Sequence, residues 1–212
     1  MARRKKISPF TVLNYALFVL IGIFMVYPFW CLVLYSFSDP SRSDLSSLYL
    51  WPEGFTLSAY EYAFSKKILF TGFFNSVFIT VVGTAVNMIL SVMLAYPLSR
   101  EKLPGKRFFS AFVVFPMLFS GGMIPTYLVI KQYGLLDSLW SLIGYMAVNV
   151  YNLLILTKFF KSIPESLIEA AKIDGCGDVM TLIQIVLPLS KASLATIALF
   201  YAVQHWNEFL YS

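Results

Sequence analysis

The residues that could carry out chemistry are few in this sequence, and none has the spacing of a catalytic motif. His205 is the only histidine, which excludes a metal centre built from several histidines. The phosphate-binding pattern Gly-x-x-x-x-Gly-Lys-Ser/Thr does not occur, and neither do the Gly-x-Ser-x-Gly and His-Glu-x-x-His patterns of hydrolases. We therefore expect a chain that is not an enzyme, with no catalytic residue, no metal site and no cofactor of its own.

A second group of chemically capable residues lies inside long apolar segments, where polar side chains are costly and therefore informative. Its members are Asn75, Asn87, Asn149, Asn152, Gln204, His205, Asn207 and Glu208. For the amides we favour hydrogen bonding between helices, with contact to a solute as the alternative. His205 is expected to pack or to gate rather than to relay protons. The candidates for a solute pathway or gate are Asn149, Asn152, Asn207 and Glu208.

The segment 161–191 carries mixed charge between two apolar segments, and its pattern predicts a short helical hairpin. Ser162 and Glu165 have the spacing of a capping box, and Pro164 suits the first turn of a helix. Gly175 is placed to end that helix in a left-handed conformation at low steric cost.

The second helix of this hairpin is expected to begin at a capping Asp178 and to be stopped by Pro188. On the first helix, three apolar residues share one face and offer area for docking another protein: Leu167, Ile168 and Ala171. Glu169 adds an exposed charge to this surface. The hairpin is therefore a candidate docking site rather than a catalytic one.

The elements that hold these residues are expected to lie in a lipid bilayer. The 212 residues are 58% hydrophobic and 13% charged, against roughly 25% charged in an average soluble domain. A soluble fold of this size could not bury that much apolar surface, so part of it must face lipid.

Five uncharged segments are long enough to cross a hydrocarbon layer of about 30 Å as helices, the fifth if it continues to the end of the chain. They predict spans at about 11–37, 70–99, 108–130, 138–160 and 192–212. Proline and glycine interrupt the third span, which neighbouring helices can tolerate. We expect an all-α polytopic membrane protein.

The basic residues predict the orientation of these spans. Twelve of the sixteen lysines and arginines fall before the first span or in the connections after the second and fourth. The positive-inside rule places these parts in the cytoplasm, together with the N-terminus and the hairpin. Topology also explains the net charge of +5, so no nucleic-acid partner is expected.

The hairpin sequence resembles a known family motif. Residues 169–175 read Glu-Ala-Ala-Lys-Ile-Asp-Gly, and Ile-x-Leu-Pro follows at 185–188. These residues and their spacing are similar to the Glu-Ala-Ala loop of permease subunits of binding-protein-dependent ABC importers. The resemblance implies that the following residues couple the chain to an ATPase: Leu167, Ile168, Glu169, Ala170, Ala171, Asp174, Gly175 and Pro188.

Other segments resemble permeases of the maltose type, which take up oligosaccharides. These are Trp51–Leu57, Asn75–Ser76, Ala95–Tyr96, Ser99–Arg100 and Trp206–Phe209. The segments 121–127 and 134–137 look like a subgroup that imports complex oligosaccharides in Gram-positive bacteria. Such permeases have six spans, so we expect residues 1–212 to be one transmembrane domain that is incomplete at its C-terminus.

The resemblance implies a multi-pass protein of the bacterial plasma membrane, working with a second homologous permease, two ATPase subunits and an extracytoplasmic solute-binding protein. ATP and magnesium would bind to the partner ATPase. Two alternatives stay open at this point. The chain could serve an ABC importer for a non-sugar solute, or it could be an ion-coupled secondary transporter.

Overall fold

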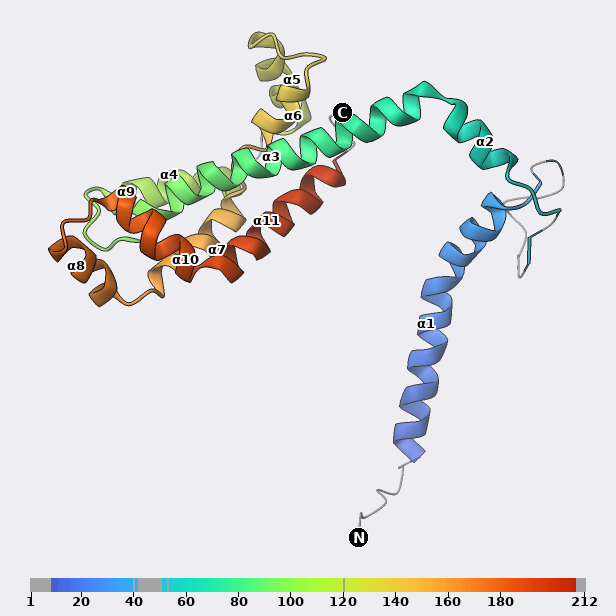
Figure 1. The fold of residues 1–212 in the computed structure, drawn as a ribbon, viewed down its shortest axis with the longest axis horizontal. Coiled ribbons are helices and arrows are strands. Elements are labelled where there is room, and N and C mark those ends of the chain that lie inside the picture. Colours follow the sequence, from blue (N-terminus) through green and yellow to red (C-terminus); the bar gives the residue numbers. More distant parts are fainter. Residues whose placement is uncertain (1–8, 40, 42–50, 53, 120, 209–212) are drawn as a thin grey trace. The chain divides into compact units, whose positions relative to one another are not determined.

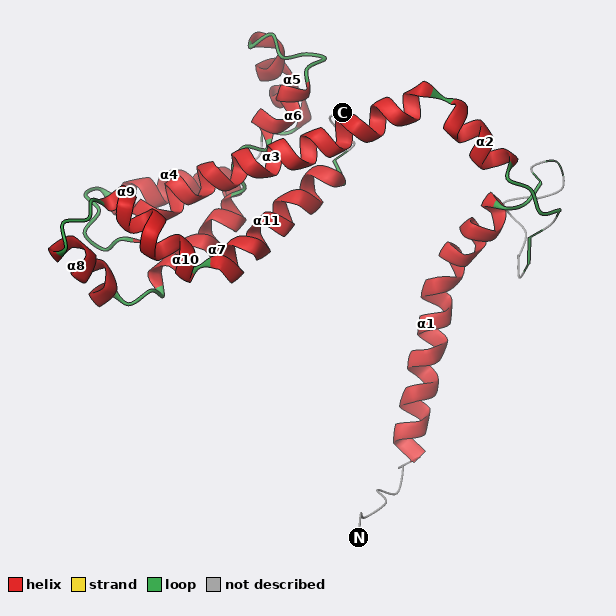
Figure 2. Cartoon of the chain, viewed as in Figure 1, coloured by secondary structure: helices red, strands yellow, loops and turns green. Residues whose placement is uncertain are grey.

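A computed structural model describes residues 9–39, 41, 51–52, 54–119 and 121–208. Every regular element in these ranges is a helix, as Figures 1 and 2 show, so the expected all-α fold is confirmed for them. Contacts divide the chain into two units, Met1–Thr71 and Gly72–Ser212. Each unit is described by itself below.

The first unit contains one long apolar helix, α1 (Pro9–Ser36), and a short one, α2 (Ser58–Ser65). The mean hydropathy of α1 reaches 2.5, and Leu34 is its only buried residue. A helix that is apolar on all sides must contact lipid or other apolar helices. α1 is therefore long and apolar enough to cross a membrane.

The second unit is built along α3 (Lys67–Ser99), a helix of 33 residues with a mean hydropathy of 2.2. α4 (Lys106–Leu118) and α5 (Met123–Gln132) follow, bent by 116° to one another. α6 (Leu139–Tyr145) and α7 (Val150–Lys161) are bent by 53°. The described helices thus provide two spans, or up to five if each bent pair counts as one.

Two apolar clusters hold the second unit together. The larger one joins Ala95 and Leu98 of α3 to Leu153, Leu156 and Phe160 of α7. The smaller one joins Ile79 of α3 to two residues of α6, Leu142 and Ile143. α7 also packs against α4 and α11 (Lys191–Trp206). The long helix α3 is therefore the common wall against which α6 and α7 pack.

The hairpin begins with α8 (Glu165–Ile173), but the expected capping box is wrong. Pro164 occupies the N-cap position, where it has no side-chain oxygen to offer. The Ser162 hydroxyl instead donates to the carbonyl oxygen of Phe159 at 2.7 Å. This bond to the preceding helix uses the hydroxyl that the capping box would need.

The second half of the hairpin is α9 (Asp178–Thr181), the π-helical segment η1 (Leu182–Val186) and α10 (Leu187–Leu189). The Asp178 side chain does not cap this helix, because Gly177 occupies the N-cap position and Asp178 is the first helical residue. Its carboxylate pairs with Lys172 at 3.1 Å. Pro188 does not stop it either, and the chain turns only at Ser190. The wider π turn before Pro188 removes the clash that a proline ring makes with the preceding turn of an α-helix.

Candidate functional site: a polar seam and a cavity between helices

Polar side chains form a seam between α3 and α11. On α3 they recur every three or four residues and so share one face: Thr80, Thr84, Asn87 and Ser91. On α11, Tyr201 and His205 are four residues apart. The Ser91 and Tyr201 hydroxyls are 2.7 Å apart, and Asn87 Nδ2 lies 3.0 Å from His205 Nε2. We call these six residues the polar seam.

A glycine allows the two helices of the seam to come this close. A Cβ atom at Gly83 would lie 2.5 Å from Nε2 of His205 and within 2.9 Å of two further ring atoms. Side chains cannot approach to such distances, so the imidazole ring occupies the space that any other residue would fill. His205 therefore has the packing role expected from the sequence, and its bond to Asn87 confirms the interhelical role of that amide.

The seam extends to α7 through Asn149. Its backbone N–H donates to the Tyr201 hydroxyl at 3.1 Å, and its Nδ2 donates to Gln204 Oε1 at 3.4 Å. Its Oδ1 accepts from the backbone N–H of Asn152 at 3.2 Å and so caps α7. Asn152 is buried, with an exposed fraction of 4%. The structure thus joins the Asn149 amide to α11, and it buries the Asn152 side chain.

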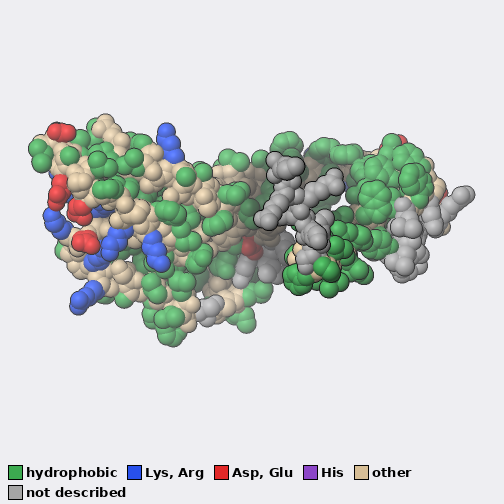
Figure 3. Space-filling view, turned by 90° about the horizontal axis from the view of Figure 1, so that it is seen from below, with side chains coloured by type: hydrophobic (Ala, Val, Ile, Leu, Met, Phe, Trp, Pro, Cys, Tyr) green, Lys and Arg blue, Asp and Glu red, His purple; other side chains and the backbone are tan. Residues whose placement is uncertain are grey.

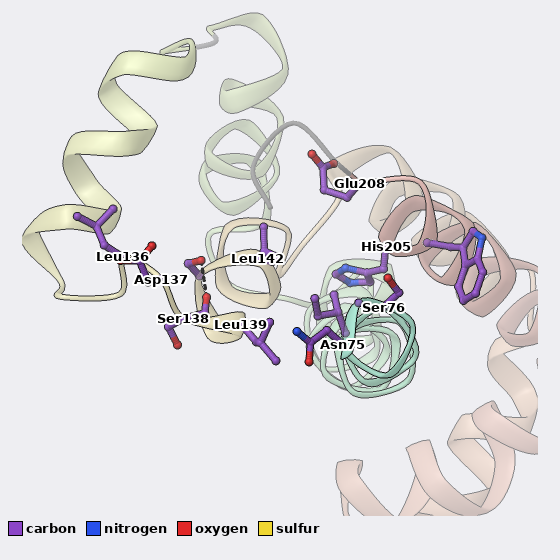
Figure 4. Close-up of a pocket in the computed structure, with 13 residues that line it drawn as sticks. Asn75, Ser76, Leu136, Asp137, Ser138, Leu139, Leu142, His205 and Glu208 are labelled. Atoms are coloured by element: carbon purple, nitrogen blue, oxygen red, sulfur yellow. Dashed lines mark hydrogen bonds between the residues drawn. The ribbon is translucent and has the colours of Figure 1, made fainter. Parts of the chain in front are cut away.

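A cavity of about 720 Å³ lies at the end of α3 and α11 that is remote from the hairpin. Figure 4 shows Asn75 and Ser76 of α3, Asp137 of the turn before α6, and His205 and Glu208 at the end of α11 around it. This volume is in the usual range of ligand-binding pockets. The cavity is therefore large enough to hold a small ligand.

The other two pathway candidates, Glu208 and Asn207, differ in whether they line this cavity. Glu208 is half-buried and lines it, whereas Asn207 is exposed, does not line it, and donates from Nδ2 to the Val203 carbonyl at 2.9 Å. Asp137 also lines the cavity but was missed by the sequence reasoning, which treated it only as part of a connection. Asp137 follows the Gly134-Leu135-Leu136 turn, and its backbone adopts a φ of 59°. No pattern of apolar residues predicts this conformation.

The turn of the hairpin has a well-defined geometry. Gly175 adopts a φ of +84°, in the left-handed region that the sequence predicts. The N–H of Cys176 donates to the Ala171 carbonyl at 2.9 Å, and the N–H of Gly175 donates to the Lys172 carbonyl at 3.1 Å. These two bonds form a Schellman motif, which satisfies carbonyls left open at a helix end.

The expected docking face of α8 is partly covered by the chain itself. Ile168 and Ala171 have exposed fractions of 3% and 5%, so they belong to the core. Leu167 remains 43% exposed. The sequence reasoning missed other exposed apolar side chains of the hairpin, namely Ile173, Val179, Met180 and Ile183. An amphipathic pattern identifies an apolar face but not which surface covers it.

Charged residues join the hairpin to the end of the helix bundle. Lys102 lies 3.8 Å from Glu169, and Lys161 lies 3.6 Å from Glu101, both pairs being exposed. Figure 3 shows Lys, Arg, Asp and Glu side chains gathered at this end of the second unit. Exposed pairs of this kind contribute little to stability individually. They mark this end as the polar end of the unit, away from the apolar flanks of its helices.

Arg100 connects the ends of two helices beneath the hairpin. Its Nη2 donates to the carbonyl oxygen of Phe160 at 3.1 Å, and its guanidinium lies 4.9 Å from the centre of the Tyr96 ring. Lys106 Nζ in turn donates to the Arg100 carbonyl at 2.8 Å. The guanidinium thus ties the end of α3 to the last turn of α7, immediately before the hairpin begins.

These features define a class of protein. Apolar helices enclose a polar seam, a cavity lies at one end, and a charged helical hairpin lies at the other. In the described ranges no three His, Cys, Asp or Glu side chains are grouped to hold a metal ion. Such an arrangement is typical of a membrane transport component. Residues 87–211 match the family described as the binding-protein-dependent transport system inner membrane component, and the chain belongs to this family.

Its relatives include transport proteins of known type. It is 48% identical over 201 residues to the polygalacturonan/rhamnogalacturonan transport system permease protein YtcP of Bacillus subtilis, covering 95% of this chain and 70% of that protein. It is 45% identical over 192 residues to protein LplC of the same organism, covering 91% of this chain and 65% of that protein. The chain thus spans about two thirds of the length of these relatives.

A solved structure has the same fold. It is that of a bacterial ABC transporter involved in the import of the acidic polysaccharide alginate. The likeness has a TM-score of 0.89 at 32% sequence identity and covers 98% of this chain and 73% of the matched chain. The chain is therefore a polytopic permease subunit of the ABC transporter kind, which rules against the ion-coupled alternative.

Proposed function

We propose that the chain forms one half of the translocation pathway of an ATP-driven importer for a carbohydrate. The names of its relatives favour an oligosaccharide. YtcP is named for polygalacturonan and rhamnogalacturonan. A relative from Streptomyces coelicolor, 30% identical, is named a diacetylchitobiose uptake permease. Nothing in the described residues favours a non-sugar solute over these carbohydrates.

The topology that we propose has five spans, with the N-terminus and the hairpin in the cytoplasm. It rests on the two long helices, on the bent pairs α4–α5 and α6–α7, and on α11 as the fifth span. The twelve basic residues that the positive-inside rule assigns to one side set its orientation. The cavity beside Asn75 and Glu208 is then at the outer end of the bundle, where a solute would enter. The hairpin lies at the opposite end, facing an ATPase.

One observation carries the coupling role of the hairpin: its second half is part of the core of the bundle. Val186 of η1 is fully buried in the same cluster as Ala95 of α3 and Phe160 of α7. Leu182 and Leu187 pack against that cluster. A force on the hairpin therefore acts directly on α3 and α7, because close-packed interiors transmit displacement.

The ATPase would supply that force. ATP binding in the partner subunits would close them, move the hairpin as a rigid lever, and shift the spans between inward- and outward-open packings. Exposed Ile173, Val179 and Met180 offer the apolar contact area, and Glu169 offers a charge. A second permease completes the pathway, and a solute-binding protein delivers the cargo from outside. ATP and magnesium stay on the ATPase.

Labelling of Cys176 tests the proposed orientation. This thiol lies in the turn of the hairpin and is half-buried. We expect a membrane-impermeant maleimide to leave Cys176 unmodified in intact cells and to modify it in inside-out vesicles, with Cys31 replaced by alanine beforehand. Modification of Cys176 in intact cells would contradict the orientation and, with it, the access of the hairpin to an ATPase.

A further inference from the structure

A second cavity, of about 410 Å³, lies at the end of the bundle that carries the hairpin. It is lined by residues of α3, of the loop after α3 and of the hairpin. Three of the lining side chains are cationic, Arg100, Lys102 and Lys172, against one carboxylate, Asp178. Figure 3 shows Lys and Arg side chains gathered at this end of the second unit. The positive excess of the lining favours an anionic ligand.

Arg100 is the cation of this cavity that has no acidic partner among the described residues, whereas Lys102 pairs with Glu169 and Lys172 with Asp178. Its Nε donates to Ser99 Oγ at 3.0 Å and its Nη2 to the Phe160 carbonyl at 3.1 Å. A guanidinium has about five N–H donors, so about three are left without a partner in the described part of the chain. Arg100 is half-buried and lines the cavity, so an anion there can accept from these donors.

The chain holds this guanidinium in a fixed position. It lies 4.9 Å from the centre of the Tyr96 ring, and its bond to Phe160 fixes one edge of its plane. Lys106 Nζ donates to the Arg100 carbonyl at 2.8 Å and so closes the loop that carries the residue. A planar arginine that is fixed in this way suits the paired oxygens of a phosphate better than a mobile lysine does.

The other side of the cavity is apolar. Met93, Pro97 and Leu182 line it, and the Met93 side chain is 62% exposed on α3. Met93 lies six residues before the last residue of α3, which is about 9 Å along the helix axis. The cavity thus runs from the charged end of a helix that is long enough to cross a membrane onto its apolar flank. This combination suits an amphiphile with a phosphate and a hydrocarbon chain better than it suits a free phosphate.

From this arrangement we infer that the cavity binds an anionic phospholipid, with Arg100 donating to the headgroup phosphate and an acyl chain lying along Met93. Basic pockets beside membrane spans recognise such headgroups. A zwitterionic lipid would bring its own cation toward Lys102 and Lys172, so phosphatidylglycerol should be preferred to phosphatidylcholine. The inference goes beyond solute import and requires only the membrane location. In the proposed topology the lipid belongs to the cytoplasmic leaflet.

The test measures lipid bound to the full chain purified in detergent. The permease is mixed with equal amounts of phosphatidylglycerol and phosphatidylcholine, and the lipids that it retains are measured by native mass spectrometry. Arg100→Gln removes the guanidinium. Lys191→Gln is the matched control, because Lys191 begins α11, is exposed and lies outside the cavity lining. It removes the same charge from the basic set at this end of the bundle.

We expect the parent to retain phosphatidylglycerol preferentially and Arg100→Gln to lower the ratio of the two lipids about tenfold, as the loss of hydrogen bonds between charged groups implies. Lys191→Gln should leave the ratio unchanged. Phosphatidylglycerol should also raise the unfolding temperature of the parent more than that of Arg100→Gln, because a ligand stabilises the state that binds it.

Arg100→Gln also loses the bond to Phe160, so Lys102→Gln provides a second check on a side chain that is 86% exposed. It should lower the lipid ratio severalfold without changing the unfolding temperature of the lipid-free protein. Equal losses for Arg100→Gln and Lys191→Gln would overturn the inference, since diffuse charge would then explain the binding. Displacement of phosphatidylglycerol by an excess of inorganic phosphate would equally contradict it, because the site would then take a soluble anion.

Discussion

Replacing Gly175 with valine is expected to lower ATP-driven uptake about tenfold while the permease stays inserted in the membrane. Gly175 adopts a φ of +84°, and a Cβ atom there would meet nothing within 4 Å. The penalty is therefore one of backbone conformation alone, roughly 1–2 kcal/mol for a non-glycine residue and more for a β-branched one. A valine would open the Schellman turn and misalign α8 against α9. Uptake in vesicles containing the partner subunits measures the effect.

Gly175→Asn is the matched control, because asparagine tolerates the left-handed conformation far better than valine. It should retain most of the uptake activity of the parent. Co-purification of the ATPase with the permease should weaken for the valine variant and persist for the asparagine variant. Equal uptake by the valine variant and the parent would mean that the geometry of this turn has no part in coupling.

Replacing Gly83 with alanine is expected to destabilise the bundle by about 2–4 kcal/mol. The new methyl group would overlap the buried His205 ring, and overpacking of this kind typically costs 1–3 kcal/mol. Displacing the ring would also break the bond between Asn87 and His205, which leaves buried polar atoms without partners. Thermal unfolding of the purified chain in detergent measures the change.

Gly72→Ala, in the same helix, provides the comparison, since a Cβ atom there meets nothing within 4 Å. Both substitutions gain the same helix propensity, so their difference isolates the packing against His205. A second check uses His205→Ala, in which Gly83→Ala should add little further cost. If Gly83→Ala and Gly72→Ala unfold at the same temperature, the close approach of α3 and α11 is not a feature of the folded protein.

The long helices could be predicted from the sequence because charge and hydropathy are properties of the chain alone. A segment without charge has to avoid water, and its length limits what it can cross. The predicted span 70–99 therefore corresponds closely to α3 (Lys67–Ser99). Gly175 could be predicted for a similar reason, since its conformational freedom is intrinsic to the residue.

The candidate pathway was harder to predict because it depends on which helices meet. Asn149 and Glu208 both lie in or beside apolar segments, but one caps α7 and the other lines a cavity. Ser91 and Tyr201 could not be singled out from the sequence, because serines and tyrosines are common in apolar helices. Only the folded structure shows that these two hydroxyls are partners. Pro188 was misread because the π turn before it depends on packing within the hairpin.

The most direct test of the central claim is whether the hairpin contacts the ATPase. Ile173, at the end of α8, is 85% exposed, and Leu199 on α11 is 60% exposed. Each is replaced by cysteine in a chain whose Cys31 and Cys176 are alanine, and the complete importer is treated with a short bifunctional thiol cross-linker. We expect Ile173→Cys to cross-link to an ATPase subunit carrying cysteines along its cleft, with a yield that changes on adding ATP, and Leu199→Cys to give no such product. Failure of Ile173→Cys to cross-link under any nucleotide condition, in an importer that transports, would contradict the account.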